Sequence, residues 1–109
     1  MNFKDAQRLS GQLPDMISTA TSSYFWGSGP AWDSAIILIP WYMYEYCLDK
    51  DILRDMYDSM NLYMDFLNSM ADQGIVGFGL GDWCYPKNSL HKDCQTEITI
   101  QGIIMQMLL

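Results

Sequence analysis

Basic residues are scarce in this sequence. It contains 6 lysines and arginines against 13 aspartates and glutamates, one histidine, and a formal net charge of −7. Nucleic-acid phosphates require a surface rich in lysine and arginine, and anionic membranes attract polybasic segments. The charge balance therefore argues against nucleic acids and membrane surfaces as partners.

A long apolar run is also missing. The most apolar stretch, residues 35–44, contains Pro40 and is followed by Glu45, so it falls well short of the roughly 20 residues that span a bilayer. Residues 1–5 lead directly into amphipathic sequence and show no signal peptide, which leaves the localisation unknown. Half of the residues are hydrophobic and 14% are aromatic, which excludes a disordered chain.

Cysteine is too rare for a disulfide framework, because three cysteines cannot all pair within the chain. Cys84, His91 and Cys94 lie in one segment and raise the alternative of a zinc site. Structural zinc sites usually contain closely spaced cysteine pairs and four ligands, whereas Cys84 and His91 are seven positions apart. We therefore expect no metal and no cofactor.

Hydrophobic periodicity predicts an all-α fold. Residues 3–10 are expected to end a helix that Gly11 terminates, and a second helix should run from Ala31 or Trp32 to Cys47 with a kink at Pro40. A third helix is expected to begin after an N-cap at Asp49 or Asp51 and to end at Gly74. A last helix or strand should begin near residue 96, with helix favoured. The core stripe of the third helix follows steps of three and four: Leu53, Met56, Met60, Tyr63, Leu67 and Met70.

The connections between these helices alternate in length. Residues 11–30 and 73–95 form two long glycine-containing loops, and a short turn lies between them. Alternate connections of an up-and-down helical array lie at the same end, so Trp32 and Trp83, 51 residues apart, should share one end. Long loops without regular structure are usually functional. This end of the structure is therefore the candidate site.

Each tryptophan has a neighbouring carboxylate, Asp33 or Asp82. A flat indole packs well on the C–H face of a sugar ring, and a carboxylate accepts hydroxyl hydrogen bonds. Other roles stay open: Trp32 and Trp83 as buried anchors, Asp82 as the cap of a turn, and Asp33 as a charge at a helix N-terminus. Trp41 is expected in the core.

The second and third helices are apolar over more of their surface than one neighbour could cover. Exposed apolar faces of this extent are typical of partner surfaces. We therefore expect residues 1–109 to be an internal fragment of a larger helical domain. Its partners would be the remaining segments of that domain, or a second copy through self-association.

Several motifs, in register along nearly the whole chain, carry a resemblance to a known family. Residues 5–7 are DAQ, residues 11–14 are GQLP, residues 26–35 are WGSGPAWDSA, residues 39–44 are IPWYMY, and residues 81–83 are GDW. This pattern resembles the catalytic domain of bacterial α-L-rhamnosidases, glycoside hydrolase family 78. One departure is Leu48, which precedes Asp49 where the family usually has glycine, so the geometry of this turn is open.

The resemblance implies a partial (α/α)6 barrel, about a quarter of a six-hairpin toroid, with both long loops at one end. It also implies hydrolysis of terminal α-L-rhamnosides with inversion, by an acid and a base that lie about 6.5–9.5 Å apart. Both carboxylates belong to motifs outside this chain, so no catalytic residue is expected here. The substrate-binding residues implied or suggested are Trp32, Trp83, Asp82 and Asp33.

The sequence thus predicts a fragment of an inverting α-L-rhamnosidase that supplies part of the sugar pocket and is inactive alone. Two alternatives stay open. One is a helical interaction module without catalysis, and the other is a fragment of a different (α/α)6 glycosidase. A catalytic pair of Asp33 and Asp82 is conceivable on geometry, although the resemblance places the catalytic acids elsewhere.

Overall fold

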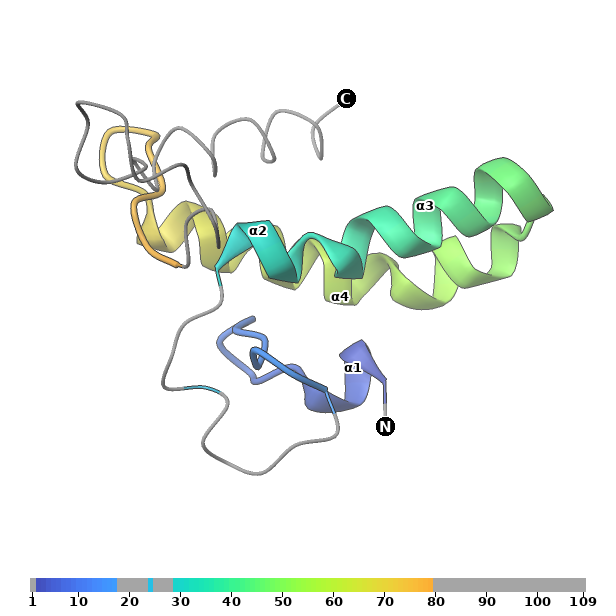
Figure 1. The fold of residues 1–109 in the computed structure, drawn as a ribbon, viewed down its shortest axis with the longest axis horizontal. Coiled ribbons are helices and arrows are strands. Elements are labelled where there is room, and N and C mark those ends of the chain that lie inside the picture. Colours follow the sequence, from blue (N-terminus) through green and yellow to red (C-terminus); the bar gives the residue numbers. More distant parts are fainter. Residues whose placement is uncertain (1, 18–23, 25–28, 80–109) are drawn as a thin grey trace, which may run out of the picture.

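The computed structural model describes residues 2–17, 24 and 29–79. Within these residues the fold is all-α: α1 (Phe3–Ala6), α2 (Pro30–Asp33), α3 (Ala35–Cys47) and α4 (Lys50–Met70), with no strand beyond an isolated bridge between Asp72 and Ile75. Helices α3 and α4 form a long antiparallel hairpin, and the N-terminal segment lies beside α4 (Figure 1). The expected all-α class is confirmed.

Helix α1 is shorter than the predicted helix over residues 3–10. It begins with a capping box, in which the Asn2 side chain accepts from the Asp5 amide and the Asp5 carboxylate accepts from the Asn2 amide, both at 3.1 Å. It ends at Ala6 because Gln7 is extended, with φ −70° and ψ 131°. The side chain of Gln7 instead donates to the backbone oxygens of Gly11 (3.1 Å) and Ser59 (3.0 Å), which fixes the segment against α4.

Gly11 allows this segment to approach α4 closely. Its φ is +92°, and a Cβ atom at this position would lie 2.8 Å from the Cβ of Phe66 and would also collide with the carbonyl oxygen of Leu62. Two residues later, Leu13 is buried in the core. The prediction that Gly11 ends the first helix is wrong, because α1 already ends at Ala6 and Gly11 closes a separate turn, in which its amide donates to Arg8 O at 2.8 Å. Its positive φ still favours glycine at this position.

The second predicted helix, over residues 31–47, is divided in two. Ser34 separates α2 from α3, although it keeps right-handed helical angles and its amide donates to Pro30 O at 3.0 Å. Pro40 lies inside α3 as expected, and the helix continues past it to Cys47. The turn that follows places Leu48 in the left-handed region, with φ 56°.

Helix α4 begins as predicted and ends earlier than predicted. Asp49 is its N-cap, since its carboxylate accepts from the amides of Asp51 and Ile52 at 3.1 Å. The helix ends at Met70, because Ala71 is extended and Asp72 and Ile75 pair across a tight turn. Gly74, which was expected to end the helix, lies within this turn.

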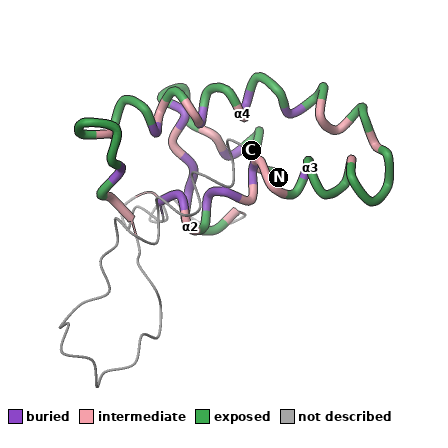
Figure 2. The backbone as a smooth tube through the Cα atoms, turned by 90° about the horizontal axis from the view of Figure 1, so that it is seen from above, coloured by how far each residue is buried: buried purple, intermediate pink, exposed green. Residues whose placement is uncertain are grey.

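The hydrophobic core is built around the predicted stripe of α4. Its buried members are contributed by α4, α3 and the two flanking segments: Leu13, Ile36, Met56, Tyr63, Leu67 and Val76. Leu53 and Met60 are half-buried, but Met70 is 48% exposed, so the last position of the predicted stripe is wrong. The burial map shows the far end of the hairpin, around the α3–α4 turn, mostly exposed (Figure 2).

Helix α3 is apolar yet covered only in part. Its buried residues are Ile36 and Pro40, whereas Trp41 is 49% exposed, contrary to the expectation that it lies in the core. Five large hydrophobic side chains of α3 are exposed: Ile39, Trp41, Tyr42, Met43 and Tyr46. Among the residues that the structure describes, no helix is both long and apolar enough to cross a bilayer.

Candidate functional site

The described ends of the two long loops meet beside α2. Gly29, which precedes α2, has φ +70°, and a Cβ atom on it would lie 2.6 Å from Gly79 Cα and 2.8 Å from Phe78 O. Only glycine permits this approach of one backbone to the other. Pro30 follows at the first helical position, where its fixed φ favours helix initiation. The loop that precedes Trp32 and the loop that leads towards Trp83 therefore share one end of the structure.

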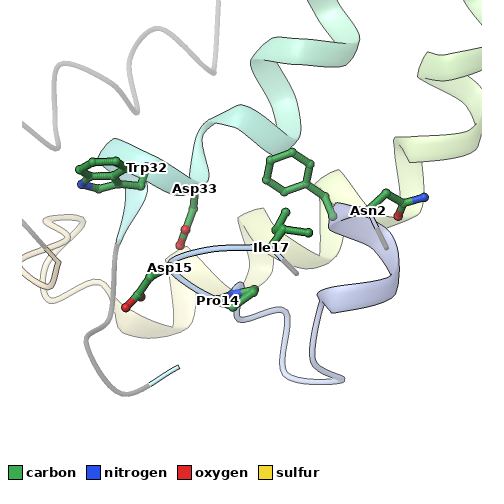
Figure 3. A pocket seen from close by; sticks show the side chains of 7 residues that line it. Asn2, Pro14, Asp15, Ile17, Trp32 and Asp33 are labelled. Carbon is green, nitrogen blue, oxygen red and sulfur yellow. The ribbon is translucent and has the colours of Figure 1, made fainter. Parts of the chain in front are cut away.

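Trp32 lies at this end on the wall of a hollow of about 370 Å³. The indole is 50% exposed, so it is not a core tryptophan. Residues from α1, α2 and the segment after Pro14 line the hollow: Asn2, Phe3, Pro14, Asp15, Ile17, Trp32 and Asp33 (Figure 3). A concave site with apolar walls and a few carboxylates is typical of small-molecule binding, and its volume lies at the lower end of the roughly 300–1,000 Å³ usual for such sites.

Asp33 lies next to Trp32 but leaves α2 in a different direction, toward the segment that contains Asp15 (Figure 3). It is only 4% exposed, and its Oδ2 accepts a hydrogen bond of 3.4 Å from the hydroxyl of Tyr63 on α4. Burial of the phenol, together with the charge and hydrogen bond of Asp33, raises the pKa of Tyr63 far above its ordinary value. Tyr63 therefore stays protonated and acts as the donor.

Sequence reasoning did not identify all residues of this hollow. Asp15, Phe3 and Ile17 line it, although they lie in segments that carry no recognisable binding motif. Tyr63 was identified only as a member of the core stripe. The available signal was the unusual position of a tyrosine hydroxyl within an otherwise apolar stripe, since a buried hydroxyl requires a hydrogen-bonding partner.

The other two predicted substrate-binding residues, Asp82 and Trp83, lie outside the described residues, as do Cys84, His91 and Cys94. Within residues 2–17, 24 and 29–79, no three histidine, cysteine or acidic side chains are grouped so that they could hold a metal ion. Cys47 is exposed and forms no disulfide bond.

The arrangement suits a neutral polyhydroxylated ligand. The Trp32 indole offers a flat apolar surface, and the carboxylates of Asp15 and Asp33 accept hydrogen bonds from hydroxyl groups. The acidic walls and the net charge of −7 disfavour phosphorylated or carboxylated ligands. The described residues thus combine the two types of contact that a sugar ring needs.

Comparison with known proteins gives a consistent result. Residues 1–107 match the model of the bacterial α-L-rhamnosidase six-hairpin glycosidase domain. The chain is 38% identical to an α-L-rhamnosidase of Formosa agariphila over 82 aligned residues. The alignment covers 72% of the chain and 8% of that protein. It is 34% identical to an α-L-rhamnosidase of Alteromonas sp. over 86 aligned residues, and this alignment covers 78% of the chain and 9% of that protein.

A third relative, an α-L-rhamnosidase of Streptomyces avermitilis, is 28% identical over 96 residues, which covers 85% of the chain and 9% of the relative. The chain therefore spans less than a tenth of the length of each of these relatives. No solved structure matches it.

Proposed function

The chain belongs to the bacterial α-L-rhamnosidase six-hairpin glycosidase domain family, and we propose that it is a segment of an α-L-rhamnosidase that forms part of the sugar pocket. In this proposal the substrate is a terminal α-L-rhamnoside. Two carboxylates outside residues 1–109 carry out hydrolysis with inversion, so they lie about 6.5–9.5 Å apart to admit a water molecule. The chain alone is then inactive.

The observation that supports this proposal is the half-exposed indole of Trp32 on the wall of the hollow, next to the Asp33 carboxylate. The hollow lies at the end where Gly29 approaches Gly79. In the proposed pocket, Trp32 packs on one face of the rhamnose ring, and Asp33 accepts hydrogen bonds from its hydroxyl groups. Trp83 and Asp82, a few residues beyond Gly79, complete the contacts from the second loop.

The α3–α4 hairpin is, in this proposal, one of the six hairpins of an (α/α)6 barrel. The exposed apolar side chains of α3 then pack against neighbouring hairpins of the same barrel. This packing supplies the cover that α3 lacks within the described residues. It also accounts for the match to a small part of much longer relatives.

The test uses the protein encoded by the longest reading frame that contains this segment, assayed with an aryl α-L-rhamnoside. Trp32→Ala should raise KM about tenfold, since an aromatic contact contributes about 1 kcal/mol and more with the area it buries. Tyr57→Ala, which removes a 60% exposed aromatic side chain from α4, is the matched control and should leave KM unchanged. The 109-residue chain should show no hydrolysis.

An unchanged KM for Trp32→Ala would contradict the role of this residue in the pocket. Hydrolysis by the 109-residue chain that is abolished by Asp33→Asn or Asp82→Asn would contradict the absence of catalytic carboxylates. Either result can be read directly from initial rates.

The exposed apolar side chains of α3 also support a second candidate, a helical interaction module without catalysis. Such a module forms a defined oligomer that does not respond to L-rhamnose, and Trp32→Ala lowers its stability without affecting any sugar contact. Sedimentation analysis of the 109-residue chain with and without L-rhamnose distinguishes the two candidates.

A further inference from the structure

The buried residues of α4 are Met56, Ser59, Tyr63 and Leu67, so two of the four carry a hydroxyl group. Tyr63 is fully buried, at 0% exposure, in the middle of α4. A phenylalanine would fill the same space without a buried hydroxyl that must be satisfied. The hydroxyl donates to Asp33 Oδ2, 30 residues away along the chain, at 3.4 Å.

Helix α2, which carries Asp33, is only four residues long. Gly29 before it has no side chain to cap it, and the hydroxyl of Ser34 after it donates to Ala31 O at 3.4 Å. Helix α4 is a 21-residue element with a capped start and a packed stripe. A hydrogen bond from α4 to Asp33 therefore links a short element at the hollow to the most extensively packed element of the described chain.

The protonation states fix the direction of this hydrogen bond. Burial and the neighbouring carboxylate keep the Tyr63 phenol protonated, so the phenol donates and Asp33 accepts. A carboxylate has about four lone-pair sites, so the hydrogen bond from Tyr63 takes up only part of the acceptor capacity of Asp33. Asp33 also lines the hollow, so one side chain contacts both the core and the candidate site.

We propose that Tyr63 is a positioning residue for sugar binding: its buried hydroxyl holds the Asp33 carboxylate in the orientation that accepts a substrate hydroxyl in the hollow. The inference rests on the proposed function, because it requires Asp33 to contact the sugar. It adds that the specificity of the pocket depends on a residue of the core, which itself touches no substrate.

The experiment is a double-mutant cycle in the protein of the longest reading frame, with Tyr63→Phe, Asp33→Asn and the double variant. Tyr63→Phe keeps the ring and removes only the hydroxyl. It should raise KM for an aryl rhamnoside about 3- to 10-fold and change kcat less than twofold, because a long hydrogen bond to a charged group contributes at the low end of the usual range. Tyr57→Phe, the same change on the exposed face of α4, should leave KM unchanged.

The two positions should also be coupled. In the Asp33→Asn background, Tyr63→Phe should change KM by less than twofold, because the carboxylate that it orients is already absent. Melting temperatures of all variants, measured in the same buffer, separate a loss of stability from a loss of binding.

Two results would overturn the inference. If Asp33→Asn raises KM but Tyr63→Phe only lowers the melting temperature, or if the two effects multiply independently, Tyr63 is a core residue with no role in binding. If Asp33→Asn itself leaves KM unchanged, the proposed contact between Asp33 and the sugar is wrong, and the positioning role is wrong with it.

Discussion

The two helices of the hairpin pack against each other but have opposite kinds of surface. Helix α3 has one charged residue in 13, Glu45, and exposes five large hydrophobic side chains. Helix α4 has six charged residues in 21 and buries a single stripe. The hydrophobic periodicity of α4 accounts for which of its residues are buried, because an apolar stripe with a polar opposite face is typical of a helix at the surface of a domain.

Helix α3 lacks such a polar face. A helix that is hydrophobic on all sides is normally buried on all sides, whereas α3 is covered on the side of α4 and exposes its aromatic residues elsewhere. Tyr42 and Tyr46 form a ring pair at 6.1 Å, and Trp41 and Tyr44 form another at 5.8 Å, along these faces. The difference supports the proposal that α3 packs against further segments of the same domain.

Helix α4 is also covered on a second side by the N-terminal segment. Lys4 forms a 2.9 Å ion pair with Asp55, and Gln7 donates to the backbone of Ser59. Leu13 completes the core above the stripe. The ion pair is largely exposed and contributes little to stability, so the packing of Gly11 and Leu13 determines how firmly this segment is held.

The substitution with the largest expected effect, Leu67→Ala, tests whether the stability of the chain depends on the buried stripe of α4. Leu67 is 2% exposed, so Leu67→Ala should reduce the free energy of unfolding by about 2–5 kcal/mol. Ile39→Ala in α3 removes a side chain that is 47% exposed and should change it by less than about 1 kcal/mol. Urea denaturation of the 109-residue chain measures both.

A large decrease in the free energy of unfolding for Ile39→Ala would contradict the contrast between the two helices, because it would mean that the exposed face of α3 is already covered in solution. Self-association of the chain is the cover that this result would indicate. The effect would then depend on protein concentration, which the same denaturation experiment detects.

The next effect concerns the contact between the N-terminal segment and α4. Gly11→Ala introduces a Cβ at φ +92° against Phe66 and Leu62, and should cost about 2–3 kcal/mol. Gly74→Ala is the matched control, since φ is +81° but no atom lies within 4 Å of the added Cβ. It should cost about 1 kcal/mol, from backbone strain alone. If the two variants lower the melting temperature equally, Gly11 is not held against α4.

The sequence predicted the helices where local signals coincide with packing. The start of α4 was predicted because Asp49 caps it, and its core stripe was predicted because Met56, Tyr63 and Leu67 follow the helical period. The ends of α1 and α4 were placed too late. In both cases the chain leaves the helix before the glycine that was expected to end it, because Gln7 and the Asp72–Ile75 pair make other contacts.

The candidate site was predicted in part. Loop lengths placed Trp32 at the end where the two loops meet, and the contact of Gly29 with Gly79 agrees with this. Asp15 could not be identified from the sequence, and the hydroxyl of Tyr63 in an apolar stripe indicated only that it needs a partner. The proximity of both residues to Asp33 depends on how three segments pack. Trp41 was assigned to the core, because its apolar surroundings in the sequence do not reveal which faces of α3 are covered.

The smallest expected effect concerns the turn that joins the two helices. Leu48 has φ 56°, in the left-handed region where a non-glycine residue costs about 1–2 kcal/mol, and the resemblance to the rhamnosidases predicts glycine there. Leu48→Gly should therefore raise the free energy of unfolding by about 0.5–1 kcal/mol, reduced from the full strain by the extra freedom of glycine in the unfolded chain.

Leu48→Ala is the control for this substitution, because it shortens the side chain but keeps the Cβ and the strain, and it should give no gain. Leu48 is 75% exposed within the described residues, so neither variant should lose much packing. If Leu48→Gly instead destabilises the full-length protein while it stabilises the 109-residue chain, Leu48 packs on a further segment there. The neighbouring segment that covers the exposed apolar side chains of α3 would then also cover the α3–α4 turn. The contrast between the apolar surface of α3 and the polar surface of α4 would in that case result from a neighbour that packs on α3 alone.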